Sequence, residues 1–176
     1  EFGIGAGTGA TYIVENGDEV NISYKTPVSV KTELKYTPAN SNFGVLLRYQ
    51  HTNTSVSGQR WFDTGENFNA IVSDNSLFLL LEYLKNSPAK WSFGGNAGLG
   101  FTSQNIDFST TETREYRFPT LNISGVVQYK INEKWALKLE PGFQFADPFS
   151  ALKIKSYNFA KEDIHFLALL GFSYKL

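Results

Sequence analysis

Hydrophobic and polar residues alternate with a period of two along most of the chain, and no segment has a convincing helical period of 3.6 residues. Such alternation is typical of β-strands, because successive side chains of a strand point to opposite faces of the sheet. Eight segments alternate for long enough to form strands. Their predicted bounds, good to about two to four residues, are 2–14, 28–37, 43–53, 76–85, 91–102, 118–131, 135–146 and 164–176.

The segments that connect these strands are alternately long and short. Three are short and rich in turn-forming residues, namely 38–42, 86–90 and 132–134. Four are long and polar, namely 15–27, 54–75, 103–117 and 147–163. This order predicts an up-and-down antiparallel meander with tight turns at one end and long loops at the other. Because the predicted strand count is even, both termini should lie at the short-turn end.

The two faces of the predicted strands differ in charge. One face is uncharged, as at Leu77, Leu79 and Leu81, whereas the other carries lysine, arginine, glutamate and many glycines. An eight-stranded barrel has an interior barely wide enough for side chains, so eight rows of Leu, Phe, Trp and Tyr would not fit inside it. The apolar face should therefore point outward into lipid. The sequence predicts an all-β fold, an eight-stranded antiparallel up-and-down transmembrane β-barrel that forms a single domain over residues 1–176.

Aromatic residues mark the short-turn end of the predicted outward face. The outward residue nearest that end is aromatic in all eight strands, although aromatic residues make up only 15% of the chain. Aromatic rings with a polar edge are enriched where a membrane meets water, so the sequence predicts a girdle at the headgroup level. The girdle residues are Phe2, Tyr36, Phe43, Tyr83, Trp91, Tyr129, Trp135 and Tyr174.

The last predicted strand has the form of a known C-terminal signal. It alternates from Phe166 to Leu176 and carries an aromatic residue, Tyr174, two places before its apolar last residue. With its glycine-rich first strand, the chain resembles the small eight-stranded outer-membrane barrels of the OmpX and OmpA transmembrane class, whose commonest last residue is Phe rather than Leu. The resemblance implies the outer membrane of a Gram-negative-type bacterium and implies no specific function.

Charged residues on the inward face form the first candidate site. Each charge is costly in a narrow lumen unless it is paired, so we expect the three glutamates to bridge to the basic side chains and to plug the barrel. The alternative, which the OmpA class suggests, is a gated small conductance in which a glutamate changes partner between arginine and lysine. The predicted lumen network is Lys31, Glu33, Arg48, Glu82, Lys130, Lys138 and Glu140.

Composition and charge exclude several classes of function. No stretch approaches the roughly 20 consecutive apolar residues of a membrane-spanning helix, so a helical membrane protein is excluded. The chain has no cysteine, and we predict neither a metal nor a cofactor. The net charge of −1 predicts no nucleic-acid partner. Glu1 opens directly into a strand pattern, as in a mature chain after signal-peptide removal, and Glu1-Phe2 is equally consistent with a cloning remnant.

Histidine is the residue on which an enzyme hypothesis would rest. Two small-barrel families modify lipid A, a deacylase with a Ser-His-Glu triad and a palmitoyl transferase. The segment from His51 to Ser55 is vaguely similar to the deacylase's His-x-Ser-Asn, but Asn53 stands where that family has serine, and the family's motif lies far nearer the C-terminus. We therefore predict no catalytic residue. His51 is interpreted as an interfacial polar residue and His165 as a hydrogen-bonding residue of the lumen.

One residue conflicts with the strand pattern. Pro141 lies inside a predicted strand, where a backbone N–H is needed for the ladder. A closed barrel has no edge on which to place it. We therefore expect a β-bulge at Glu140-Pro141-Gly142.

The long segments should face the cell exterior. They carry an excess of acidic over basic residues, so we expect divalent cations to bridge them to lipopolysaccharide. Alternation continues at 20–24 and at 152–159, which predicts strands that protrude above the membrane and bind proteins by strand addition at a sheet edge. The alternative is that these loops pack on themselves.

The leading functional hypothesis is a monomeric, non-enzymatic outer-membrane barrel with a plugged polar lumen. It would act in surface interaction, adhesion or envelope integrity through its extracellular loops, in contact with lipid and lipopolysaccharide. The second hypothesis is a small barrel that lets ions or solutes pass. A lipid A-modifying enzyme is the third and least favoured.

Overall fold

The computed structural model of the chain describes residues 1–12, 20–60, 67–85, 89–108, 113–148 and 164–176. These residues form nine β-strands, and among them no helix is long and apolar enough to cross a membrane. The strands are β1 (Phe2–Tyr12), β2 (Val20–Tyr24), β3 (Val28–Tyr36), β4 (Phe43–Arg60), β5 (Asn67–Leu84), β6 (Trp91–Phe108), β7 (Thr113–Lys130), β8 (Trp135–Ala146) and β9 (Ile164–Tyr174).

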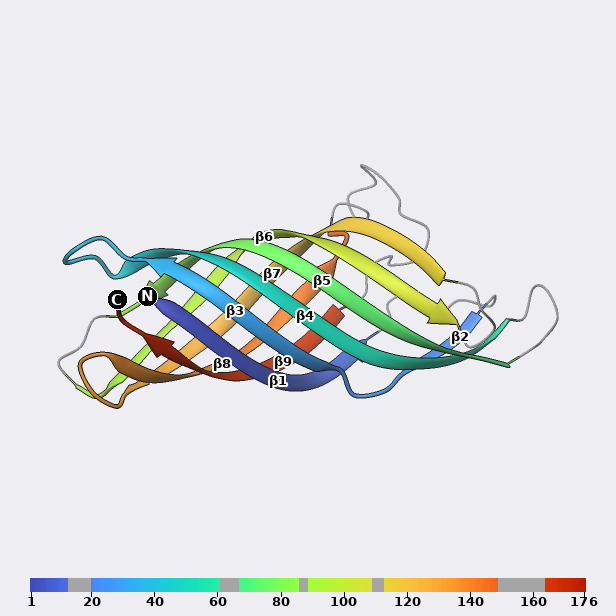
Figure 1. Ribbon diagram of the computed structural model, residues 1–176, viewed down its shortest axis with the longest axis horizontal. Coiled ribbons are helices and arrows are strands. Elements are labelled where there is room, and N and C mark those ends of the chain that lie inside the picture. The colour runs from blue at the N-terminus through green and yellow to red at the C-terminus, as the bar shows by residue number, and fades with distance from the viewer. Residues whose placement is uncertain (13–19, 61–66, 86–88, 109–112, 149–163) are drawn as a thin grey trace.

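The described strands close into an eight-stranded ring. Hydrogen-bonded neighbours follow the order β2-β4-β3-β1-β9-β8-β7-β6-β5, and β5 pairs in turn with β4. β3 pairs with the first part of β4 and β2 with its last part, so β2 and β3 together occupy one position in the ring. Neighbouring strands are antiparallel throughout. The predicted all-β, eight-stranded antiparallel barrel is confirmed (Figure 1).

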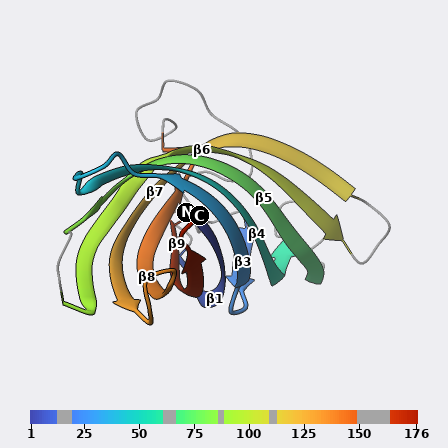
Figure 2. The ribbon, with the colours of Figure 1, turned by 60° about the vertical axis from the view of Figure 1, so that its left-hand side comes forward.

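Both chain ends lie at one end of the barrel, which we call the short-turn end, and the opposite end is the long-loop end. Phe2 of β1 is the register partner of Tyr174 of β9, and Figures 1 and 2 both show the N and C ends side by side. In the turn between β3 and β4, the Ser41 N–H donates to the Pro38 carbonyl over 3.1 Å. Asn40 adopts a left-handed φ of 60° there, which asparagine tolerates better than most residues.

Four strands are longer than the sequence pattern predicts. β4 and β5 take up most of the predicted loop 54–75, and β6 and β7 take up most of the predicted loop 103–117. The prediction of long loops was wrong in these two segments. Their polar residues sit on the outward face of strands that continue into water, where a polar outward face replaces the apolar one.

The predicted strand within the segment 15–27 is confirmed as β2. It is separated from β3 at 25–27, where Pro27 has no N–H to offer a ladder. Side-chain hydroxyls satisfy the carbonyls of this break, because Thr8 Oγ1 donates to the Pro27 carbonyl and Thr54 Oγ1 to the Lys25 carbonyl, each over 2.7 Å. The second predicted protruding segment, 152–159, lies outside the described residues.

The bulge expected at Pro141 is absent from β8. Gly142 is the partner of Ser124 and Leu139 is the partner of Val127, so both strands have two residues between these pairs and the register does not shift. The ladder is interrupted instead. Gly125 lies opposite the proline, and even a Cβ added there would lie 3.8 Å or more from Pro141, which is an ordinary van der Waals distance. The proline ring therefore fits in the barrel wall, and no extra residue is needed.

Candidate functional site

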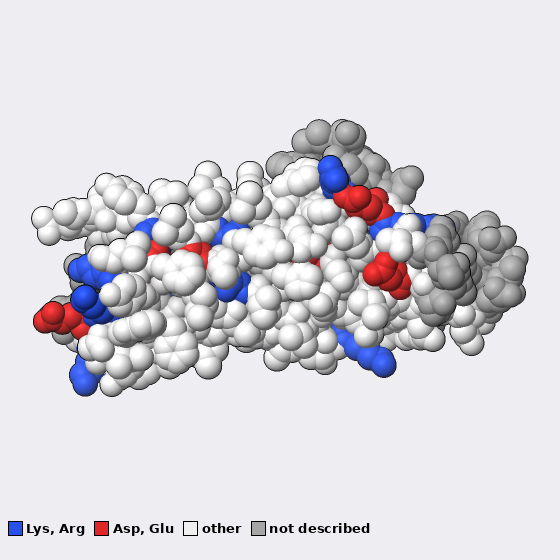
Figure 3. All heavy atoms as spheres, viewed as in Figure 1, with Lys and Arg blue, Asp and Glu red and all other residues white. Residues whose placement is uncertain are grey.

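Most outward side chains between the two ends of the barrel are large and apolar. Leu79 is 62% exposed and Phe93 is 61% exposed. Figure 3 shows uncharged side chains over most of the middle of the barrel, with projecting charged side chains toward its two ends. A continuous apolar surface of this extent is stable against lipid and not against water. This lipid-facing band includes Ile4, Val30, Leu34, Val45, Leu47, Leu77, Leu81, Leu99, Ile123, Leu139 and Leu170.

The aromatic residues predicted for the girdle line up across neighbouring strands at the short-turn end. Ring centroids are 4.8 to 5.1 Å apart in three cross-strand pairs, which are Phe43–Tyr83, Trp91–Tyr129 and Trp135–Tyr174. Lys90 Nζ lies 6.0 Å from the ring centre of Tyr129, and Lys134 Nζ lies 5.9 Å from that of Tyr174. Aromatic rings with an ammonium beside them suit the membrane–water interface.

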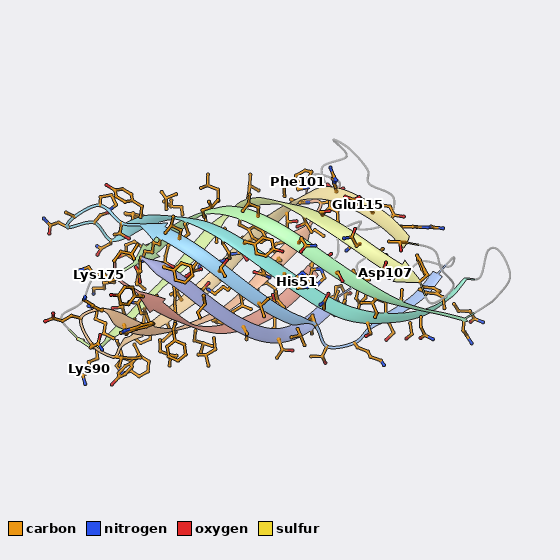
Figure 4. The ribbon with its side chains drawn as sticks, in the orientation of Figure 1. His51, Lys90, Phe101, Asp107, Glu115 and Lys175 are labelled. Carbon is orange, nitrogen blue, oxygen red and sulfur yellow. The ribbon has the colours of Figure 1, made fainter. Side chains whose placement is uncertain are left out.

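The outward face changes from apolar to polar at one row of residues. In β4, β5, β6 and β7 the last apolar register row is Tyr49, Leu77, Phe101 and Pro119, and the next outward row is His51, Asn75, Ser103 and Arg117. We call the second row the boundary row. Asp107 and Glu115 lie beyond it and are exposed, and Figure 4 shows them with His51 in the long-loop half of the molecule.

The inward face changes in the opposite sense beyond the boundary row. Its side chains there form a buried apolar cluster, against which Tyr24, Phe68 and Tyr116 also pack. The wall of the barrel is therefore polar outside and apolar inside, as in β-structure surrounded by water. This part of β4 to β7 protrudes from the membrane. The cluster consists of Val56, Ala70, Val72, Ile106 and Phe108.

Charged side chains form a buried ion network inside the membrane-spanning part of the barrel. Arg48 Nη2 donates to Glu33 Oε2 at 2.7 Å and to Glu140 Oε2 at 2.5 Å. Lys31 Nζ contacts Glu140 and lies 3.1 Å from Glu33 Oε2. The members of the network are Lys31, Glu33, Lys35, Arg48, Glu82, Lys138 and Glu140.

Lys138 connects the three carboxylates of the network. Its Nζ lies 2.6 Å from Glu82, 3.0 Å from Glu33 and 3.3 Å from Glu140. Glu82 also pairs with Lys35 Nζ at 2.6 Å. Glu82 and Glu140 are 0% and 1% exposed, so the network closes the lumen around them. Charges buried this deeply are tolerated because each one is paired.

Six of the predicted network residues are joined by the ion pairs described above, and the seventh, Lys130, lies apart from those pairs. Lys130 is half-buried at the short-turn end of β7, where it lines the mouth of the barrel. Lys35, which is not in the predicted set, is a further cation of the network. The alternation of charges in β3 places Lys35 on the inward face beside Lys31 and Glu33, so the signal was present in the sequence.

A layer of uncharged polar side chains covers the ion network on its long-loop side. Asn96 Nδ2 donates to Glu140 Oε2 at 3.2 Å, and Asn122 Nδ2 donates to Asn96 Oδ1 at 3.0 Å. Gln144 Nε2 donates to Gln50 Oε1 at 3.0 Å. All four amides are buried. The Asn96 amide gives Glu140 Oε2 a second donor besides Arg48, and the other amides hydrogen-bond to one another.

The barrel is similar to OprG of Pseudomonas aeruginosa, an outer-membrane protein. The two share 15% sequence identity with a TM-score of 0.65, over 99% of this chain and 95% of that chain. Neisserial surface protein A shares 12% identity with a TM-score of 0.58, over 99% of this chain and 97% of its own. Ail, the attachment invasion locus protein of Yersinia pestis, shares 14% with a TM-score of 0.53, over 98% and 96%.

These likenesses concern the fold. No protein-family model matches the sequence, and no curated protein sequence matches it. The shared fold and the lipid-facing band together make the chain an integral β-barrel protein of the bacterial outer membrane. By the convention of such barrels, the short-turn end faces the periplasm and the long-loop end faces the cell exterior.

An apolar group inside the lumen was missed by sequence reasoning. Leu46, Phe78 and Leu80 are buried on the inward face and pack together. Glycines of β6 give them room, because a Cβ at Gly100 would lie 2.3 Å from the Phe78 ring. The lumen is therefore filled on this side by apolar side chains as well as by ions. The parity of β5 gives the signal, since Phe78 and Leu80 alternate with the lipid-facing leucines.

The two histidines have hydrogen-bond partners that do not form a catalytic arrangement in the described residues. His51 Nδ1 lies 2.9 Å from Asn75 Oδ1, which also accepts from Tyr49 Oη at 2.7 Å. This pair belongs to the boundary row. His165 is buried and faces the lumen, with Nδ1 2.9 Å from Thr11 Oγ1. Glu66, the acidic residue that a triad with His51 and Ser55 could use, lies outside the described residues.

Proposed function

We propose that the protein is a non-enzymatic outer-membrane protein that acts in surface interaction or envelope integrity through the β-sheet it holds outside the membrane. The observation that carries this proposal is the inversion of polarity at the boundary row. β4 to β7 have 18 residues each, whereas β8 has 12. At about 3.3 Å per residue, the difference gives roughly 20 Å of additional strand.

The edges of the protruding sheet offer a way to bind a partner. Within the described residues, the Asp147 N–H donates to the Pro119 carbonyl and β8 pairs with β7 from Thr120 onward, so residues 113–118 of β7 have β6 as their one described neighbour. β2 likewise pairs with β4 only. Unpaired backbone groups at a sheet edge can accept an extended segment of another protein. We expect partner proteins to bind by strand addition at these edges, while lipopolysaccharide surrounds the barrel in the membrane.

A likeness to a protein that was solved with a bound ligand supports this proposal. Ail of Yersinia pestis has been solved in complex with the heparin analogue sucrose octasulfate, and that structure aligns with this chain at a TM-score of 0.52. Sulfated glycans are therefore a reasonable first set of probes for this chain.

The experiment is an adhesion assay in which the protein is expressed in a bacterial strain that lacks other adhesins. We expect the expressing cells to adhere in larger numbers than cells carrying an empty vector to surfaces coated with heparin or with matrix proteins. Ser55→Glu with Asn69→Glu, on the exposed outer face of β4 and β5, should reduce adhesion. Ala39→Glu, in a short turn, should not. Equal adhesion by expressing and empty cells would contradict the proposal.

A small ion-permeating barrel is the second candidate. One observation favours it, namely that Lys138 Nζ lies within 3.3 Å of three carboxylates, so that a glutamate has more than one cation available as a partner. Exchange between such partners would open and close a narrow path. Bilayer conductance separates this candidate from the first.

A further inference from the structure

A hollow of about 810 Å³ opens at the short-turn end of the barrel. The turn at 37–42, the turn at 132–134 and the last residues of β9 surround it. Lys35 lines its wall and pairs with Glu82 of the ion network, so the hollow ends on the plug and does not continue through the barrel. It is a vestibule that is open to the periplasm.

Basic side chains predominate around this vestibule. Lys35 is balanced by Glu82 at 2.6 Å and by Glu1 at 3.4 Å. That leaves an excess of lysines over the remaining carboxylate, Glu133, so the vestibule has a positive potential that attracts anions. Figure 4 shows one of these lysines, Lys175, at the rim. The lysines in excess are Lys85, Lys134 and Lys175, whereas Lys130, which also lines the wall, has an interaction of its own.

Two buried polar groups line the vestibule without a partner of their own. Ser173 and Gln128 are 4% and 8% exposed, and Ser173 Oγ and Gln128 Oε1 have no hydrogen-bond partner among the described residues. A buried polar atom without a partner is unfavourable unless something else binds it. The Ser173 hydroxyl can donate to an anion, and the Gln128 amide can turn its N–H₂ inward by rotation about its last bond.

The geometry points to a binding site for a phosphate-bearing anion in this vestibule. Lys85 and Lys175 would hold the anion at the rim, and Ser173 and Gln128 would donate to it from the wall. A phosphate suits this arrangement better than a carboxylate, because its additional oxygens can accept from donors on several sides at once. Trp135 belongs both to the girdle and to the wall, so the site lies at the level of phospholipid headgroups.

The test is a titration of inorganic phosphate into the protein in non-ionic maltoside micelles, followed by backbone amide NMR. We expect saturable shifts at Lys85, Ser173 and Lys175. Lys85→Gln with Lys175→Gln should weaken the apparent affinity about tenfold, since two charge-assisted contacts are lost. Lys90→Gln is the matched control, because Lys90 lies at the same end but outside the vestibule (Figure 4). It should bind phosphate like the wild type.

A second arm separates the two sources of phosphate. If a lipid headgroup is the ligand, nanodiscs of phosphatidylglycerol should shift the same amides without added phosphate, and nanodiscs of phosphatidylcholine should shift them less. If a soluble anion is the ligand, added phosphate should shift these amides equally in both lipids. Absence of saturable shifts at these amides in micelles and in both lipids would overturn the proposal. An unchanged affinity in the double lysine variant would also overturn it.

Discussion

Glu140 occupies the centre of the ion network, where it contacts Lys31, Arg48 and Lys138. Glu140→Gln keeps the shape of the side chain and removes its charge, so three cations lose a counter-charge in a buried site. Breaking a buried pair in this way typically costs about 3–5 kcal/mol. We expect a fall of that order in the free energy of unfolding, measured with urea in lipid vesicles.

The control for this change is Glu115→Gln. Glu115 pairs with Arg117 at 2.7 Å on the outer face, where both side chains are well exposed. Exposed ion pairs contribute little because water screens them. The unfolding curve of this variant should match that of the wild type. Equal curves for Glu140→Gln and Glu115→Gln would show that the network is not essential to the stability of the barrel.

Asp74 is a buried carboxylate at the long-loop end, three residues beyond Leu77 and therefore outside the membrane. Burial raises the pKa of its carboxyl to about 6, while a hydrogen bond from Gln104 and the nearby His51 act to lower it. The folded pKa exceeds the unfolded value of about 3.9, so the folded protein holds the proton more tightly. Stability should therefore fall as pH rises from about 4 to about 6, and it should stay lower above that range.

Asp74→Asn tests this pH dependence. The amide cannot ionise, so the fall in stability between about pH 4 and pH 6 should disappear and the variant should be about 2–3 kcal/mol more stable at pH 7.5. Unfolding curves at a series of pH values measure it. Asp107→Asn, at an exposed position of the same end, serves as the control. A fall in the variant as steep as that of the wild type would contradict the assignment.

The sequence predicts the network residues well because charge and strand parity are both visible in it. Glu33, Arg48 and Glu140 can be assigned to the lumen on those grounds, whereas their partners depend on how eight strands tilt and stagger, which parity does not specify. The pairing of Lys35 with Glu82 is one such partner that parity alone does not give. The buried set around Phe78 escaped prediction for another reason. Phe78 and Leu80 have the inward parity of β5, but they are apolar, so the contrast between charged and apolar faces that marks the lumen elsewhere is missing there.

The boundary row predicts that the two ends of one strand respond differently to charge. Leu79 and Ile71 are both outward residues of β5 and are 62% and 54% exposed, but they lie on opposite sides of Asn75. Leu79→Arg places a charge near the middle of the bilayer, which costs about 2–4 kcal/mol. Ile71→Arg places it in water and should be nearly neutral. Urea unfolding in vesicles of both variants measures the difference.

Equal destabilisation by the two changes would move the membrane boundary to the end of β5.

The boundary row also explains why the predicted strands were shorter than the observed ones. A strand that leaves lipid for water keeps its period of two but exchanges its polar and apolar faces, as Ile106 and Asp107 of β6 illustrate. A search for continuous apolar alternation stops at the exchange and assigns the remainder to a loop. Pattern alone locates the membrane part of these strands and not their ends.

For the whole molecule, the short-turn end should face the periplasm. Single cysteines can report this cleanly, because the natural chain has none. Cysteines at Asn69 and Asp107, beyond the boundary row, should react with a membrane-impermeant thiol reagent on intact cells, whereas cysteines at Ala39 and Glu133 should react only after the outer membrane is permeabilised. Labelling at Glu133 on intact cells would reverse the orientation. The sequence-based outer positions Trp61 and Tyr157 lie outside the described residues.

Transport through the whole barrel depends on whether the ion network stays closed. Arg48 and Glu82 are 0% exposed, and the amides of Asn96 and Asn122 cover the network on one side, so the described residues offer ions no wide path past them. We predict that the wild type passes almost no steady current in a planar bilayer. Arg48→Ser with Lys138→Ser replaces two long side chains by short ones and should raise the conductance, provided that the variant still refolds in vesicles. A steady wild-type current that vanishes on mutation of Arg48 or Glu82 would instead favour the ion-permeating barrel, because a closed network would carry no current in the wild type.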